Sequence, residues 1–172
     1  GGYIGAIKRQ LGMVTIFNAI FTIAGTTNEF VIRVVNVICV PIVVYAGYRI
    51  LREMSENIKE IFYYGLFALF CFPLFLYTPY VYGEVISLTA GMVFIWAAHV
   101  YLKSSKVGAW VTLLVCSVIG NLARGNFPVI MIAFAVIAFL YSIRRKNIMP
   151  CLCAVSLFVA IVLANELNTN YY

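Results

Sequence analysis

The chain has 172 residues, of which 64% belong to the hydrophobic set AVILMFWYC and only 10% are charged, with a mean hydropathy of +0.99. A soluble domain carries about 25% charged residues and a disordered chain has low hydrophobicity, so both classes are excluded. The net charge of +6 comes mainly from basic residues in short tracts between apolar segments, which is the pattern of membrane insertion and not of nucleic-acid binding.

The composition therefore predicts an all-α, polytopic transmembrane helix bundle. A helix needs about 20 apolar residues to cross a bilayer, so this length holds roughly six or seven helices in one transmembrane domain, residues 1–172. The sequence opens on Gly1 with no signal-peptide pattern and closes on a polar stretch, 168–172, directly after an apolar run. We expect an internal fragment of a longer protein.

Residues 1–25 form the first segment. Lys8 and Arg9 precede an apolar run from Leu11 to Gly25, which measures only about 22 Å as a helix. Two interpretations stay open for residues 1–25: a short spanning helix, or an amphipathic helix at the membrane interface.

A helix start is predicted at Thr26-Thr27-Asn28-Glu29. This stretch has the spacing of a capping box, in which Thr26 accepts a hydrogen bond from the Glu29 amide. We expect the helix to run to about Ile50, with Glu29, Arg33 and Asn36 on one face because they are spaced i, i+4, i+7. Apolar and charged positions then alternate at helical spacing, which predicts a short surface helix over 50–61.

The second half contains apolar segments separated by polar turns. A turn at Pro79 and Gly83 carries tyrosines, which suit a membrane–water boundary. The first apolar segment, 61–77, contains Pro73. The predicted spans that follow it are 85–102, 109–121, from Pro128 to 143, and 148–164.

The basic residues predict the orientation. They concentrate in alternate connections, which the positive-inside rule assigns to the cytoplasm. The cytoplasmic set is Arg49, Arg52, Lys59, Lys103, Lys106, Arg144, Arg145 and Lys146. The outer connections hold Glu29, Glu84, Arg124, Glu166 and the tyrosines, with Arg33 at a nearby helix end.

Arg124 is the strongest candidate for ligand binding. It is the basic residue of an outer connection and precedes a helix whose first turn contains Pro128, with Asn126 as the expected N-cap. A helix N-terminus offers free N–H groups and a partial positive charge, so Arg124 beside it predicts an anion site suited to phosphate. The alternative is an arginine that reaches lipid headgroups.

Glu84 is the candidate catalytic residue. In the first turn of a helix it either stabilises the macrodipole or supplies a carboxylate for acid–base work or for a divalent cation, the one cofactor left open. The candidate substrate-binding residues are Arg124, Arg33, Asn126 and Tyr82. Glu29 and Arg33 can alternatively form an ion pair with a purely structural role at the helix start. The functional hypothesis requires Arg33, Glu84 and Arg124 to meet in one cavity.

Other chemistry has little support in the sequence. His99 lies about 22 Å from Glu84 along the same helix and cannot share its site. The five cysteines lie in apolar stretches without a CxxC pair, so they predict packing and neither zinc binding nor disulfides. Hydrolase triads, glycine-rich phosphate loops and zincin motifs are missing from the sequence.

The order of several segments resembles the GT-C superfamily of membrane glycosyltransferases, especially the PMT/ArnT-like group and its bacterial polymer-modifying relatives. The segments are Gln10-Leu11-Gly12, the stretch from Gly25 to Glu29-Phe30-Val31-Ile32-Arg33, Tyr48-Arg49-Ile50-Leu51-Arg52, Tyr77 to Glu84, and Asn121 to Pro128. The last two are similar to the family's acidic outer loop and to its basic re-entry segment. Lys8-Arg9-Gln10-Leu11 stands where the family has K-P-P-L or H-P-P-L.

This resemblance implies an integral-membrane enzyme that transfers a sugar from a polyprenyl-phosphate donor at the extracytoplasmic face. Arg124 would match the basic residue near the carrier phosphate and Glu84 the acid of the second loop, while the family's first-loop catalytic acid would lie before residue 1. The implied partners are the lipid bilayer, the polyprenyl-phosphate-linked sugar and an acceptor glycan, lipid or protein, without nucleic acid. The implied location is the bacterial plasma membrane, in the cell envelope.

Two other functions remain open from the sequence. A transporter or flippase module would use the same polar residues as a pathway, although the inverted or parallel repeats of transporters are not apparent. A non-catalytic membrane assembly subunit is the third interpretation.

Overall fold

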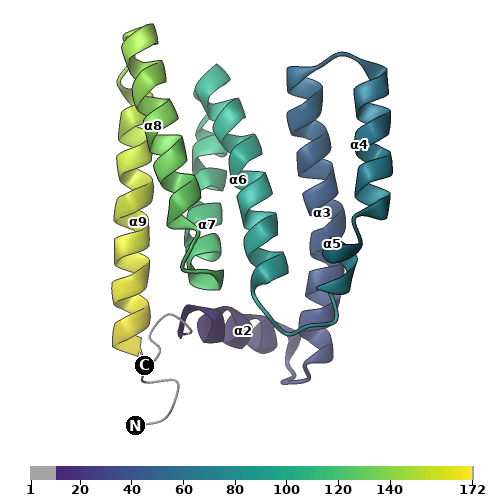
Figure 1. Cartoon of the computed structure of the whole chain (residues 1–172). Coiled ribbons are helices and arrows are strands. Elements are labelled where there is room, and N and C mark those ends of the chain that lie inside the picture. Colours follow the sequence, from purple (N-terminus) through teal and green to yellow (C-terminus); the bar gives the residue numbers. More distant parts are fainter. Residues whose placement is uncertain (1–10, 172) are drawn as a thin grey trace.

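A computed structural model describes residues 11–171 and is helical throughout its regular structure (Figure 1). The predicted all-α class is confirmed. The helices are α2 (Leu11–Ala24), α3 (Phe30–Met54), α4 (Ile58–Phe70), α5 (Phe72–Leu76), α6 (Glu84–Ser104), α7 (Val107–Ala123), α8 (Pro128–Arg145) and α9 (Met149–Tyr171). Residues 1–10, with Lys8 and Arg9, lie outside the described part of the chain.

Four of these helices, α3, α6, α8 and α9, are long and apolar enough to cross a bilayer, and α2 and α7 are shorter apolar helices. The chain is a multi-pass membrane protein. The four full-length candidates are fewer than the six or seven predicted, because α7 and α4 have 17 and 13 residues.

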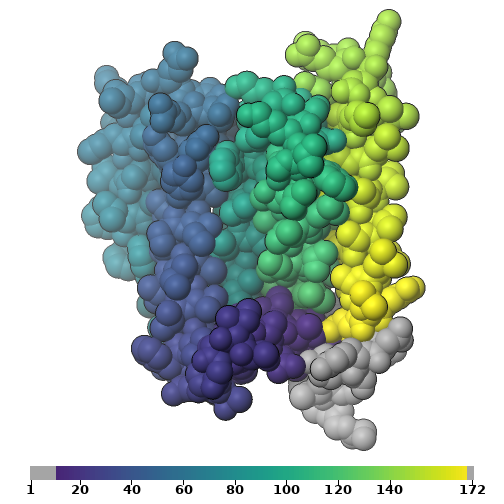
Figure 2. Space-filling view, turned by 180° about the vertical axis from the view of Figure 1, so that it is seen from behind, coloured from purple at the N-terminus to yellow at the C-terminus, as the bar shows by residue number. Residues whose placement is uncertain are grey.

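The long helices run side by side, and α2 lies across their lower end (Figure 1). From behind, α2 covers the base of the bundle between α3 and α9 (Figure 2). Gly12 allows this, since a Cβ there would lie 2.6 Å from the carbonyl oxygen of Leu122 in α7. Thr15 also donates a hydrogen bond to Asn168 of α9.

The main core lies among α6, α7, α8 and α9. Phe94, Leu113, Met131 and Leu157 are each at most 1% exposed. The Phe94 ring meets the rings of Phe127 and Phe134 edge to face, at centroid distances of 5.9 and 5.6 Å, which is a favourable aromatic geometry. Helix α3 packs on the other side of α6.

Two sequence predictions about helix ends are wrong. The N-cap of α3 is Glu29, without a side-chain cap bond, and Thr26 Oγ1 accepts from the Asn28 amide and not from Glu29. Just before the helix, Asn28 Oδ1 accepts from the Phe30 amide at 2.9 Å. This is a local Asx interaction, which competes with a capping box at such a site.

The surface helix predicted over 50–61 is also not a separate element. Helix α3 continues through Ile50 to Met54, and the break comes at residues 55–57. Ser55 Oγ accepts from the Asn57 amide, and Asn57 Oδ1 accepts from the Lys59 amide and so caps α4. These short side-chain bonds decide where the helix stops, and helical periodicity does not reveal them.

The basic connections lie at one end of the bundle. The α3–α4, α6–α7 and α8–α9 connections all lie at the upper end of the bundle in Figure 1, and α6 and α8 begin at the lower end. Glu84 and Arg124 therefore lie at the opposite end from the eight basic residues assigned to the cytoplasm. We call the two ends the basic end and the outer end.

Impermeant thiol labelling tests this orientation. Tyr82→Cys is expected to react from outside the cell, and Ser104→Cys only after permeabilisation, because the positive-inside rule places the basic end in the cytoplasm. Both positions are exposed, and the native chain is the control because its cysteines are buried or half-buried. Rapid labelling of position 104 in intact cells would reverse the orientation.

Docking of α2 can be tested at Gly12. Gly12→Ala should lower the free energy of unfolding by about 1–3 kcal/mol, because its Cβ meets backbone that cannot move aside. Unfolding in detergent measures the effect. Gly65→Ala is the matched control, since its Cβ has no atom within 4 Å, and an equal loss in both variants would contradict the docking argument.

Candidate active site

A cavity of about 740 Å³ lies between α4 and α5 on one side and α6 and the start of α8 on the other. Val43 and Val44 of α3 also line it. Its walls are mostly apolar, including Phe67, Leu74, Met92 and Ile130. Pockets for organic ligands have this volume and this lining, with a few polar groups to orient the ligand.

The charged groups of the cavity gather at its outer end. Glu84, Arg124 and Asn126 line it there, from the start of α6 and the α7–α8 connection. An apolar pocket that ends in a cation and a carboxylate suits an amphiphile with a long apolar chain and an anionic head.

Glu84 and Arg124 form an ion pair in which the guanidinium Nη2 donates to Oε1 of the carboxylate. The backbone brings the two residues together, since a Cβ on Gly83 would lie 2.6 Å from the carbonyl oxygen of Ala123. Glycine thus permits the segment before α6 to touch the end of α7. Arg124 is in extended backbone, and its amide donates to the Gly120 carbonyl.

The pair is half-open to the surroundings. The Arg124 side chain is 48% exposed and that of Glu84 is 30% exposed, so the guanidinium keeps donors for another anion. Glu84 Oε2 is buried and has no hydrogen-bond partner among the described residues. One carboxylate oxygen therefore holds the arginine, and the other is covered and has no partner among the described residues.

Two of the predicted substrate-binding residues lie elsewhere. Arg33 is exposed on α3, does not line the cavity and makes no ion pair with Glu29 or any other described residue. Tyr82 is 61% exposed and stacks on Tyr80 at a centroid distance of 6.4 Å. The requirement that all three ionic residues meet in one cavity is therefore not met, because Glu84 and Arg124 meet there and Arg33 does not.

Asn126 lines the cavity, but its predicted role as a side-chain cap of α8 is wrong. The helix begins without a side-chain cap bond. The amides of Phe127, Val129 and Ile130 donate to the carbonyls of residues 124, 126 and 127, and Pro128 has no N–H. The predicted anion site would therefore depend on Arg124 more than on free amides of the helix N-terminus.

Asn36 is a residue of this region that the sequence reasoning left without a role. It is completely buried, and its Nδ2 donates to the carbonyls of Tyr80 at 2.9 Å and Thr78 at 3.3 Å. It thereby ties the outer loop between α5 and α6 to α3. The sequence shows Asn36 as a single amide side chain among Val and Ile residues. A polar side chain inside a span usually has a hydrogen-bond partner, so this pattern could have indicated its role.

Tyr64 holds the other wall of the cavity. Its hydroxyl donates to the Val44 carbonyl at 3.0 Å, and it packs on Gly47, where a Cβ would overlap the phenol. Helix α4 ends at Cys71, and Pro73 at the start of α5 cannot continue the hydrogen-bond ladder. The break turns Leu74 and Tyr77 toward the cavity.

The donor set does not fit a divalent cation at Glu84. Within residues 11–171 no three His, Cys, Asp or Glu side chains cluster in a way that could hold a metal ion. Glu84 also has one of its two oxygens on Arg124.

Comparisons of the chain with protein-family models, with curated proteins and with solved structures found no match.

The role of Asn36 gives a prediction. Asn36→Leu should lower the free energy of unfolding by about 1–3 kcal/mol, because the Thr78 and Tyr80 carbonyls lose their donor. Proteolysis of the outer loop should also become faster. Unfolding in detergent and limited proteolysis measure the two effects.

The matched control is Asn18→Leu, which replaces an exposed asparagine of α2. If both variants unfold and are cleaved like the native chain, Asn36 does not hold the loop.

Proposed function

We propose that the chain is the transmembrane part of a glycosyltransferase that takes a sugar from a polyprenyl phosphate at the extracytoplasmic face of a bacterial plasma membrane. The observation that carries the proposal is the apolar cavity of about 740 Å³ that ends at the Arg124–Glu84 pair. The likeness of the segment order to GT-C enzymes agrees with it.

The cavity suits the donor because its two parts match the two parts of the molecule. The isoprenoid chain is apolar and would pack by van der Waals contact against Phe67, Leu74 and Met92. The phosphate is accepted by the exposed N–H groups of Arg124, whose planar guanidinium binds two oxygens of one phosphate. Glu84 holds the guanidinium in place.

In the reaction, a hydroxyl oxygen of the acceptor forms a bond to the anomeric carbon of the sugar, and the bond from that carbon to the phosphate oxygen breaks. Polyprenyl phosphate leaves with the electron pair, and Arg124 stabilises the charge that develops on it. The hydroxyl proton passes to a carboxylate base, a role for which Glu84 is the candidate because it is the carboxylate that lines the cavity.

Substitution in the full-length protein tests the proposal. Arg124→Ala and Glu84→Gln should each lower kcat/KM for transfer from a polyprenyl-phosphate sugar by about 100-fold or more, through the lost cation and the lost base. Arg124→Lys should recover part of the activity, since it keeps the charge but not the planar contact.

Arg33→Ala and Glu29→Gln are matched controls, because they remove the same groups at the same end of the bundle but outside the cavity. Unchanged transfer in the Arg124 and Glu84 variants would contradict the assignment of this site. Unchanged transfer together with lost movement of labelled lipid across the bilayer would favour the flippase interpretation.

A further inference from the structure

A second cavity, of about 670 Å³, lies at the basic end, between the last turn of α3 with the residues that follow it and the end of α6. Its lining is polar, with Arg49, Arg52, Glu53 and Glu56 on one side and Lys103 on the other. The proposed glycosyl transfer uses none of these residues.

Two arginines of this cavity are held by tyrosines. Arg49 donates to the Tyr45 hydroxyl at 3.0 Å, and Arg52 donates to the Tyr48 hydroxyl at 3.2 Å. Each tyrosine lies one helical turn before its arginine, so the two pairs repeat on α3. Neither guanidinium pairs with a carboxylate in the part of the chain that the structure describes.

The Arg49 guanidinium is further fixed by aromatic rings. It lies 5.1 Å from the ring centroid of Trp96 in α6 and 5.9 Å from that of Tyr45. Such cation–π contacts orient the cation and leave its in-plane N–H groups free. The arginine is therefore preorganised for an anion.

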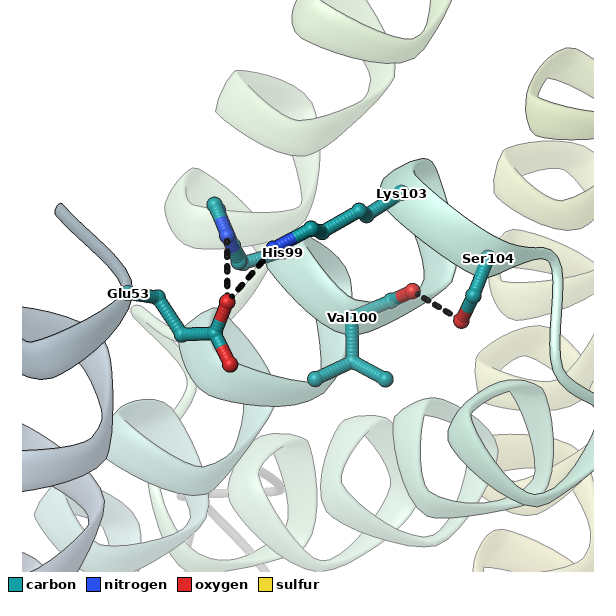
Figure 3. Close-up of polar contacts among 5 residues, drawn as sticks. All are labelled: Glu53, His99, Val100, Lys103 and Ser104. Carbon is teal, nitrogen blue, oxygen red and sulfur yellow. Dashed lines mark hydrogen bonds and ion pairs between the residues drawn. The ribbon is translucent and has the colours of Figure 1, made fainter.

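Glu53, one of the two carboxylates that line the cavity, already forms an ion pair with a residue of α6. Glu53 Oε2 lies 2.9 Å from the Lys103 ammonium and 3.8 Å from His99 Nε2, and both groups reach it from α6 (Figure 3). The other carboxylate, Glu56, is exposed, where salt screens its repulsion of an anion. Neither arginine is therefore neutralised by a carboxylate at ion-pair distance in the described part of the chain, and Glu53 acts on Arg49 only from beyond that distance.

We propose that this cavity binds the phosphate of an anionic phospholipid headgroup. Both a lipid and free phosphate carry this chemistry, but the position favours the lipid. The cavity lies at the end of α3, a helix long and apolar enough to cross a bilayer, and Met54 and Tyr45 beside it are 76% and 51% exposed, so acyl chains can lie against them. Basic pockets between helices at the cytoplasmic side bind lipid headgroups in this way.

Quenching of Trp96 fluorescence in nanodiscs tests the proposal. Brominated phosphatidylglycerol is titrated against phosphatidylcholine, in a Trp110→Phe background that leaves Trp96 as the remaining tryptophan of the chain. Arg49→Gln and Arg52→Gln should each lower the preference for phosphatidylglycerol by about fivefold. Quenching is expressed relative to the unbrominated lipid, which removes the direct effect of Arg49 on the indole.

The matched control is Arg144→Gln with Arg145→Gln, because these arginines lie at the same end on α8, and Arg145 also contacts a ring, that of Tyr141 at 5.7 Å. It should keep the native preference. Tyr45→Phe with Tyr48→Phe keeps both charges but releases the guanidiniums, and should weaken the preference. An equal loss in the α8 control, or none in the Arg49 and Arg52 variants, would overturn the site.

Inorganic phosphate, added to nanodiscs of phosphatidylcholine alone, distinguishes the source of the anion. It should change Trp96 fluorescence little. A saturable change that depends on Arg49, without a preference for phosphatidylglycerol, would replace the lipid with a soluble phosphate and overturn the headgroup assignment.

Discussion

The outer end of the protein depends on a backbone contact between the segment before α6 and the last residue of α7. Gly83 lies against the carbonyl of Ala123, and the next residue on each chain segment is a member of the Glu84–Arg124 pair. An ion pair that is 30–48% exposed contributes only about 0–1 kcal/mol, too little to hold two helices together. Packing therefore sets the position of the charges, and the pair itself contributes little to holding the two helices together.

The general architecture could be predicted because it follows from composition and charge. Apolar runs and alternating basic connections specify a membrane-spanning helical bundle and the end at which each polar residue lies, and Glu84 and Arg124 lie at the same end as expected. Their contact across 40 residues of sequence could not be derived, since it depends on how α6 and α7 pack.

Arg33 shows why sharing a nominal helix face is not enough. The buried stripe of α3 passes through Ile32, Asn36, Cys39 and Val43, at steps of three or four residues. Arg33 is one position from Ile32, about 100° around the helix, and is exposed. The spacing from Arg33 to Asn36 predicts that the two side chains share a face of α3. Only the packing of the neighbouring helices decides that Asn36 is buried while Arg33 stays exposed. Local breaks such as those at residues 55–57 and Cys71 escape prediction for a similar reason, since single side-chain bonds or a proline set them.

The cavity exists because α4 and α5 are attached to α3 and contribute little to the core. Ala68 and Leu74 are their buried residues, and Phe70 and Phe72, which do not line the cavity, are each at least 65% exposed. In a bilayer these rings face lipid, where exposure costs nothing, so this wall needs no further protein to cover it. The Tyr64–Val44 hydrogen bond and the Asn36 bonds to the outer loop fix the wall at its middle and at its outer end. Under the proposed function, the apolar chain of a polyprenyl-phosphate donor would enter beside α4 from the membrane, because this wall is open to lipid, while its phosphate would stay at the level of Arg124.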